Sequence, residues 1–114
     1  MRTTSNSTRK LTLSYRDELI KWIKLDPKRG VGYLNAAWEE GPEAFLIALK
    51  DVVDARGGIT KLAKKTGMHR VSLHGVLSKA GNPRLQNLSR ILDALNMRFT
   101  LAPKSVPKRR AKAS

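Results

Sequence analysis

The segment ITKLAKKTGMHRVSLHGVLS, residues 59–78, contains two short helical patterns separated by a glycine. Apolar residues recur at helical spacing on both sides of Gly67, which predicts one helix over about 59–66 and a second over about 69–78. The inward positions are Ile59, Leu62 and Ala63 in the first helix and Leu73, Val76 and Leu77 in the second. Because glycine readily adopts positive φ, we expect the two helices to be joined by a tight turn.

This segment also meets the constraints of a helix-turn-helix. The first helix needs a small residue where the second crosses it, and Ala63 is small. The turn needs a residue that tolerates positive φ four places later, where Gly67 stands. The apolar anchors before, in and after the turn are Leu62, Met68, Leu73 and Val76. The alternative is an ordinary helical hairpin within a bundle, which the same apolar spacing allows.

The distribution of charge favours the helix-turn-helix. The chain of 114 residues contains 23 Lys and Arg against 9 Asp and Glu, a net charge of +14. Residues 55–92 hold eight bases and no acid, whereas residues 11–54 hold eight of the nine acids. Such a basic face attracts a polyanion such as nucleic acid. The alternative is that these basic residues only keep the protein soluble, but solubility does not require 38 residues without one carboxylate.

Signals outside this segment predict a mainly helical fold. Apolar spacing indicates a first helix over about 14–24. Three pairs of a cap and a proline predict further helix starts: Asp26-Pro27, Gly41-Pro42 and Asn82-Pro83. After the last helix, Met97, Phe99 and Leu101 alternate with polar residues, which predicts a short strand in need of a pairing partner. We expect an all-α compact bundle of five to six helices, with one short C-terminal strand at Met97–Leu101.

The chain is expected to comprise one folded domain and two basic ends. Residues 1–13 are predicted to be a flexible arm and residues 102–114 a flexible tail, on either side of a DNA-binding domain at 14–101. The polar N-terminus argues against a signal peptide, and no stretch approaches the roughly 20 apolar residues that cross a bilayer. The chain lacks cysteine, which excludes a disulfide scaffold. These features predict a cytoplasmic protein.

In a helix-turn-helix, the second helix lies in the major groove with its N-terminal residues at base edges. The residues expected at base edges are Arg70, Val71, His74 and Gly75. The residues expected at phosphates are His69, Lys61, Lys64, Lys65, Ser78 and Lys79. Arg70 can pair with guanine through two nitrogens, and Val71 can contact a thymine methyl group. Gly75 either permits close approach to DNA or is a tolerated defect of the helix.

Other kinds of site find little support. His69 and His74 are five residues apart, about 140° around a helix, so they do not form a metal-ligand pair on one face. Ser72 lies near His74, but no carboxylate is close in sequence to orient the histidine as a base. We therefore expect no enzyme, metal or cofactor. Three aromatic residues at helical spacing are expected in the core rather than in a base-stacking platform: Trp22, Tyr33 and Trp38.

Two long stretches resemble a known family. They are DPKRGVGYLNAAWEEGPEAFLIALKDVVDARGG at 26–58 and LAKKTGMHRVSLHGVLSKAGNPRLQNLSRILDALNMRFTL at 62–101. With the first helix, they resemble the addiction-module antidote family, the HigA-type antitoxins with a Cro/CI-type helix-turn-helix. The resemblance implies a lambda repressor-like domain, a homodimer, and double-stranded DNA binding that represses the protein's own operon. It also implies neutralisation of a cognate toxin, often a small RelE/ParE-like ribonuclease encoded beside the antitoxin.

The resemblance breaks at three positions that are expected to face DNA. The family usually has Ser or Thr near His69, a tyrosine near His74 and a basic residue near Gly75, so the operator sequence does not carry over. Arg70 matches the family's usual basic residue. The alternatives to an antitoxin are a solitary or prophage repressor, a protein-interaction module with secondary DNA binding, and a nonspecific nucleic-acid binder.

Overall fold

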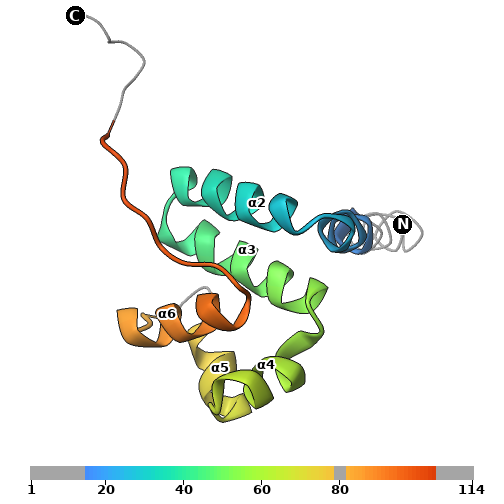
Figure 1. Ribbon diagram of the computed structural model, residues 1–114, viewed down its shortest axis with the longest axis vertical. Coiled ribbons are helices and arrows are strands. Elements are labelled where there is room, and N and C mark those ends of the chain that lie inside the picture. The colour runs from blue at the N-terminus through green and yellow to red at the C-terminus, as the bar shows by residue number, and fades with distance from the viewer. Residues whose placement is uncertain (1–14, 79–81, 105–114) are drawn as a thin grey trace, which may run out of the picture.

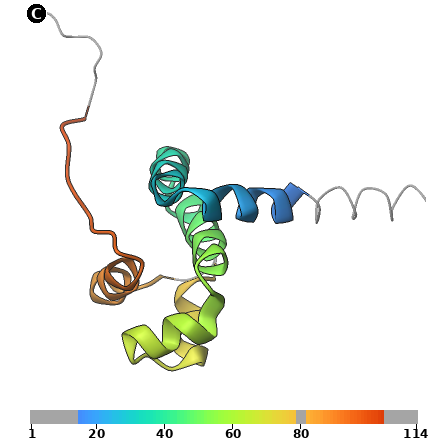
Figure 2. The same ribbon diagram turned by 45° about the vertical axis from the view of Figure 1, so that its right-hand side comes forward.

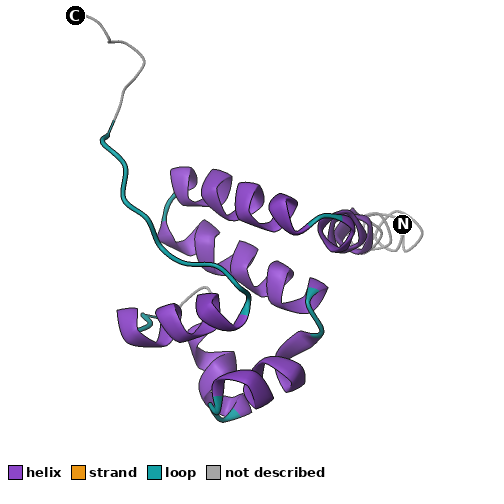
Figure 3. Cartoon of the chain, in the orientation of Figure 1, coloured by secondary structure: helices purple, strands orange, loops and turns teal. Residues whose placement is uncertain are grey.

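The computed structural model describes residues 15–78 and 82–104. All regular secondary structure in these residues is helical (Figures 1 and 3). Residues 15–25 are helical and lead into α2. The helices that follow are α2 (Pro27–Glu40), α3 (Pro42–Ala55), α4 (Gly58–Thr66), α5 (Arg70–Val76) and α6 (Leu85–Ala94). The predicted all-α architecture is therefore confirmed for this part of the chain.

Local capping explains where α2 and α3 begin. The Asp26 carboxylate accepts a hydrogen bond from the backbone N–H of Lys28 at 3.0 Å, and Pro27 follows as the first helical residue. Gly41 separates α2 from α3 with φ of +128°, a region that strongly favours glycine. Both of these predicted starts are confirmed.

The predicted start of α6 at Asn82-Pro83 is wrong by about two residues. Arg84 is still extended, with φ of −73° and ψ of 145°, and the helix begins at Leu85. Leu85 is itself 71% exposed, and the face packed on the core begins at Leu88. A helical turn at residues 82–84 would therefore bury no additional apolar surface.

Helix α3 is the centre of the core. Its buried side chains include Leu49, Val52 and Val53, each no more than 1% exposed. Helix α2 packs antiparallel along α3, and α4 and α5 lie at the opposite end of the molecule from α2 (Figures 1 and 2). This arrangement separates α2, which lies within the segment 11–54 that holds eight of the nine acids, from α4 and α5, which lie within the acid-free segment 55–92.

The prediction that Trp22 and Trp38 belong to the core is wrong, because they are 46% and 57% exposed. The buried positions of α2 are Gly30, Leu34 and Ala37, and Trp38 is not among them. The indole of Trp38 lies at the rim of the α2–α3 contact and packs edge-on against Phe45, with ring centroids 5.6 Å apart. Helix periodicity predicts which face of a helix points to the core. It does not predict whether a side chain at the edge of that face is covered by a neighbouring helix.

The strand predicted at Met97–Leu101 is absent from the described residues. The backbone N–H of Met97 donates to the carbonyl of Leu92 at 2.8 Å, and residues 98–104 have no regular structure. Phe99 is 45% exposed and Leu101 is completely exposed. A strand forms only where a neighbouring strand pairs with its backbone groups, and no strand stands beside this segment within the described residues.

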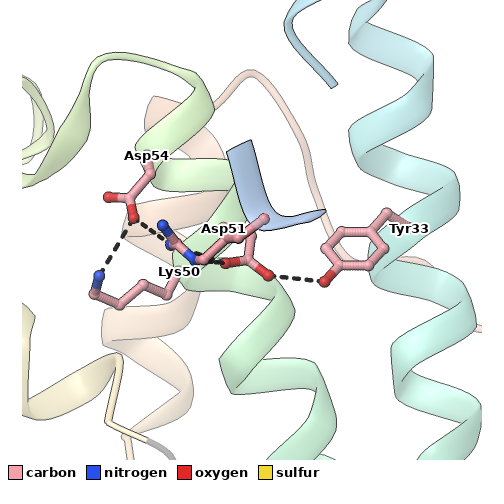
Figure 4. Close-up of polar contacts among 5 residues, drawn as sticks. Tyr33, Lys50, Asp51 and Asp54 are labelled. Carbon is pink, nitrogen blue, oxygen red and sulfur yellow. Dashed lines mark hydrogen bonds and ion pairs between the residues drawn. The ribbon is translucent and has the colours of Figure 1, made fainter. Parts of the chain in front are cut away.

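Five polar residues tie the first helical segment and α2 to α3 (Figure 4). The carboxylate of Asp51, only 6% exposed, accepts hydrogen bonds from Arg16 Nε at 3.0 Å and from the Tyr33 hydroxyl at 2.8 Å. Asp54 pairs with Arg16 at 2.6 Å and with Lys50 at 3.3 Å. A buried carboxylate is tolerated when it is paired and hydrogen-bonded in this way. The cluster fixes the position of the helical residues that precede α2.

This cluster predicts a specific loss of stability at alkaline pH. Burial, then the hydrogen bond to Asp51 and its negative charge, raise the pKa of Tyr33 above its ordinary value. An unfolded tyrosine ionises near pH 10, so above about pH 10 the unfolded chain binds fewer protons than the folded chain. Folding stability should therefore fall as pH rises above 10. Tyr33→Phe removes the contribution of the tyrosine hydroxyl to this pH dependence. The free energy of unfolding of the variant, measured by urea denaturation between pH 8 and 11, is therefore expected to decline less steeply than that of the parent protein.

Tyr15→Phe is the matched control, because Tyr15 is 72% exposed. The charge of Tyr15 contributes less to the raised pKa of Tyr33 than burial and Asp51 do, so this variant is expected to lose stability with rising pH nearly as steeply as the parent protein. Equal slopes for Tyr33→Phe and the parent protein would contradict the assignment.

Candidate functional site

A three-residue connection links α4 to α5, and its geometry depends on Gly67. This residue has φ of +76° and ψ of 8°, and its N–H donates to the Ala63 carbonyl at 2.9 Å. The hydroxyl of Thr66 donates to the Leu62 carbonyl at 2.9 Å and accepts from the Met68 N–H at 3.1 Å. The left-handed conformation expected at Gly67 is therefore confirmed, and Thr66 supplies further hydrogen bonds that hold the connection.

Arg90 is a feature of this connection that the sequence analysis missed. Its Nη2 atom donates to the carbonyl of Thr66 at 2.7 Å, so α6 holds the C-terminal end of α4. A guanidinium at this end also interacts favourably with the helix dipole. The two residues are 24 positions apart, and no local pattern in the sequence links them.

Helix α5 is held in place by packing rather than by capping. Leu73, Val76 and Leu77 are 0%, 8% and 3% exposed, which confirms the predicted inward face. His69 precedes the helix in an extended conformation and makes no side-chain capping hydrogen bond. A helix of seven residues is not stable by itself in water, so its contact with the core maintains it.

The outward face of α5 brings together the four residues that were expected at base edges. Arg70, Val71, His74 and Gly75 are all exposed, and Val71 is 82% exposed. A shallow depression is lined by Arg70, Val71 and His74 together with His69. A Cβ atom built on Gly75 would meet nothing within 4 Å, so the packing of the chain gives no reason for glycine here.

The residues expected at phosphates lie beside this face or on α4. Lys61, Lys64 and Lys65 are exposed on α4, and His69 and Ser78 are exposed at the two ends of α5. A second hollow, at the junction of α3 and α4, is lined by Lys61, Lys65 and Arg56. Lys79 was predicted at a phosphate and lies outside the described residues.

The positive charges of α4 and α5 are not neutralised by nearby acids. Every ion pair between described residues involves Arg16, Lys21 or Lys50, all from the first half of the chain. The surface that carries Lys61, Lys64, Lys65 and Arg70 therefore has a positive potential, which suits an anionic partner.

The described residues contain neither a cluster of metal-binding side chains nor a membrane-spanning helix. No group of three His, Cys, Asp or Glu side chains lies close enough to hold a metal ion in that part of the chain. Among the same residues, no helix is both long enough and apolar enough to span a bilayer.

Comparison with known proteins gives two matches. Residues 24–103 match the model of a family described as probable addiction module antidote protein. An uncharacterized protein of Haemophilus influenzae (strain Rd) is 35% identical to this chain over 68 residues, which are 59% of this chain and 69% of the relative. No solved structure matches the chain. The residues that match the family model include α2 to α6, and therefore the exposed face of α5.

Proposed function

The chain belongs to the probable addiction module antidote family, and from this premise we propose that it is the antitoxin of a type II toxin–antitoxin module. In this proposal it binds double-stranded DNA at its own operator, represses its operon and neutralises a cognate toxin. The observation that carries the DNA-binding part is the outward face of α5, whose residues are exposed beside cations without acidic partners. The protein acts in the cytoplasm as a binding protein and not as an enzyme.

Helices α4 and α5 serve as the helix-turn-helix in this proposal. Helix α5 enters the major groove, and Arg70, Val71, His74 and Gly75 meet base edges. The phosphates are contacted by residues on both sides of that helix: His69, Lys61, Lys64, Lys65, Ser78 and Lys79. Two contacts support this assignment: Leu73 anchors α5 to the core, and the Arg90–Thr66 hydrogen bond holds the C-terminal end of α4.

The proposal includes two protein partners. A second copy of the chain would present a second α5 to the other half-site of a symmetric operator. The toxin would be a small RelE/ParE-like ribonuclease. The family membership supports a toxin partner.

A substitution at Gly75 is expected to have opposite effects on the stability of α5 and on its binding to DNA. Gly75→Ala is expected to raise stability by up to about 1 kcal/mol, because alanine favours a helix interior and the site has space. The same methyl group would stand between α5 and DNA, so operator affinity should fall. Chemical denaturation and a DNA-binding titration measure the two effects.

Gly32→Ala is the matched control, since a Cβ there also meets nothing within 4 Å and the residue lies on α2. We expect it to stabilise the protein with no loss of DNA affinity. If Gly75→Ala also binds the operator as tightly as the parent protein, the prediction that α5 approaches DNA closely at Gly75 is wrong.

The proposed function is tested with DNA from upstream of the protein's own gene. Binding to this DNA and to unrelated DNA of equal length is measured at several salt concentrations between 50 and 200 mM. Phosphate-driven binding weakens steeply with salt, but a specific complex keeps a large preference at each concentration. If the ratio of the affinity for upstream DNA to the affinity for unrelated DNA is near one at every salt concentration, the protein is a nonspecific nucleic-acid binder instead.

The antitoxin part is tested with the small reading frame next to the gene. Its product should arrest growth when expressed alone, and co-expression of this chain should restore growth. The two proteins should also co-purify. Specific DNA binding without such a toxin would favour a solitary repressor.

A further inference from the structure

The hollow where α4 turns away from the end of α3, here called the α3–α4 hollow, combines cationic and apolar side chains (Figure 1). Its volume is about 340 Å³, which is within the range of small-molecule sites. Its cations are Arg56, at the end of α3, and Lys61 and Lys65, on α4. Three buried side chains of the core also line it: Val53, Leu62 and Leu95. Among the described residues that line it, none is acidic and none belongs to α5.

The two lysines are directed to the same hollow by the helix and by a glycine. A Cβ atom built on Gly57 would stand 2.5 Å from Lys61 Cδ, so the stem of Lys61 folds back over the connection between α3 and α4. Lys65 follows four residues later and therefore lies on the same face of α4. Like charges at this spacing destabilise a helix, and a bound anion removes that repulsion.

The acids closest in sequence to the lining residues do not neutralise these cations. Asp54 is already paired with Arg16 at 2.6 Å and with Lys50 at 3.3 Å. Asp93 is exposed on α6 and takes part in none of the ion pairs between described residues. In this part of the chain, the three cations of the α3–α4 hollow therefore have no carboxylate as a counter-ion.

Arg56 also has an unused hydrogen-bond donor. Its Nε atom is buried without a hydrogen-bond partner, the one side-chain atom of this kind in the described residues. Its Nη2 atom reaches the carbonyl of Pro27 at 3.5 Å, which is too long for a strong hydrogen bond. A buried N–H without an acceptor costs free energy, so native proteins contain few of them. Because Arg56 lines the hollow, an oxyanion bound there can supply the acceptor.

We propose that the α3–α4 hollow binds a small molecule that carries two adjoining phosphate groups. The planar guanidinium of Arg56 suits paired phosphate oxygens, and Lys61 and Lys65 act as point charges. Two phosphate groups, rather than one, match three cations that lack counter-ions. A free ligand is favoured over the DNA backbone because the lining comes from α3, α4, α6 and the core, and not from the helix proposed to enter the major groove.

The binding of this ligand goes beyond the proposed function, but its consequence rests on that function. Lys61 and Lys65 are also proposed to contact DNA phosphates, so the ligand and the operator compete for the same two side chains. The ligand is therefore expected to lower the affinity for the operator, which makes the α3–α4 hollow a regulatory site.

The test uses inorganic pyrophosphate, titrated into the full chain without divalent cations. Calorimetry measures the affinity at a constant ionic strength of about 0.15 M, at which exposed charges are screened beyond about 8 Å. Lys61→Ala and Lys65→Ala are each expected to lower the affinity roughly tenfold, because each removes a hydrogen bond between charged groups. Lys64→Ala is the matched control, since it removes the same charge from the same helix and Lys64 does not line the hollow. It should bind pyrophosphate as tightly as the parent protein.

Nuclear magnetic resonance locates the ligand. On addition of pyrophosphate, the backbone amide of Gly57 and the Nε–H of Arg56 should shift, whereas the amides of Val71 and His74 on α5 should not. Shifts along α5 in place of these would overturn the proposal. An equal loss of affinity in Lys64→Ala and in the two variants of the hollow would also overturn it, because a diffuse positive surface produces that result.

DNA titrations distinguish a failure of this site from a failure of the proposed function. At constant ionic strength, pyrophosphate should weaken operator binding by the parent protein. If Lys61→Ala and Lys65→Ala lose affinity for unrelated DNA but bind pyrophosphate as the parent does, the lysines serve the DNA backbone and the ligand site is wrong. A protein that binds pyrophosphate as expected but shows no preference for its operator would overturn the DNA-binding proposal and leave the ligand site supported.

Discussion

Leu73→Ala is expected to lower the free energy of unfolding by about 2–5 kcal/mol, which is the usual effect of truncating a fully buried leucine. Leu73 is 0% exposed and stands in the middle of α5, with Val76 and Leu77 as the other buried residues at its C-terminal end. Domains of this size have a total stability of roughly 5–15 kcal/mol, so the loss would be a large part of it. Because α5 has no side-chain cap, a cavity at this position should loosen the helix that carries the candidate site.

Val71→Ala is the matched control on the same helix. Val71 is 82% exposed, so its truncation should change stability by no more than about 0.5 kcal/mol. Urea denaturation of the two variants beside the parent protein measures the difference. If Leu73→Ala is as stable as Val71→Ala, α5 is not anchored to the core through Leu73.

Arg70→Ala is expected to weaken binding to the operator by about 1–3 kcal/mol and to relax the preference at one base pair. Arg70 is the first residue of α5 and is exposed on the face that also carries Val71 and His74. Its planar guanidinium can donate two parallel hydrogen bonds to guanine, whereas a lysine acts at a phosphate as a point charge. The measurement is a titration against the operator and a set of its single-base variants.

Lys64→Ala separates base recognition from attraction to phosphate. Lys64 is exposed on α4, and its removal should weaken binding to specific and unrelated DNA nearly equally. Both variants should remain as stable as the parent protein, because neither side chain is part of the core. If Arg70→Ala retains the affinity and the base preference of the parent protein, α5 does not read the major groove.

Local signals in the sequence determined most of the helices. Asp26-Pro27 and Gly41-Pro42 start α2 and α3 because capping and proline geometry act over two or three residues. Gly67 ends α4 because its positive φ does not continue a helix, which is also a local effect. The inward face of α5 follows from a spacing of three and four residues, so Leu73, Val76 and Leu77 could be assigned without a structure.

The exposed residues of the candidate site were also accessible to sequence reasoning. Once the buried face of α5 is assigned, Val71 and His74 fall outside it, whereas Arg70 stands three residues before Leu73 and is exposed because it occupies the first turn of the helix. The acid-free composition of residues 55–92 located the positive surface. What these residues bind is a proposal that neither spacing nor composition decides.

Only the tertiary structure decided which distant residues meet. Arg16 pairs with Asp51 and Asp54, 35 and 38 residues away, and Arg90 reaches Thr66 across 24 residues. Such contacts depend on how whole helices cross, and a periodic pattern contains no information about that. The exposure of Trp22 and Trp38 has the same origin, because it depends on how their helices pack against the rest of the fold. Alternation at Met97–Leu101 marks a segment able to form a strand, but a strand forms only when a partner backbone supplies its hydrogen bonds, and the single chain has none within the described residues.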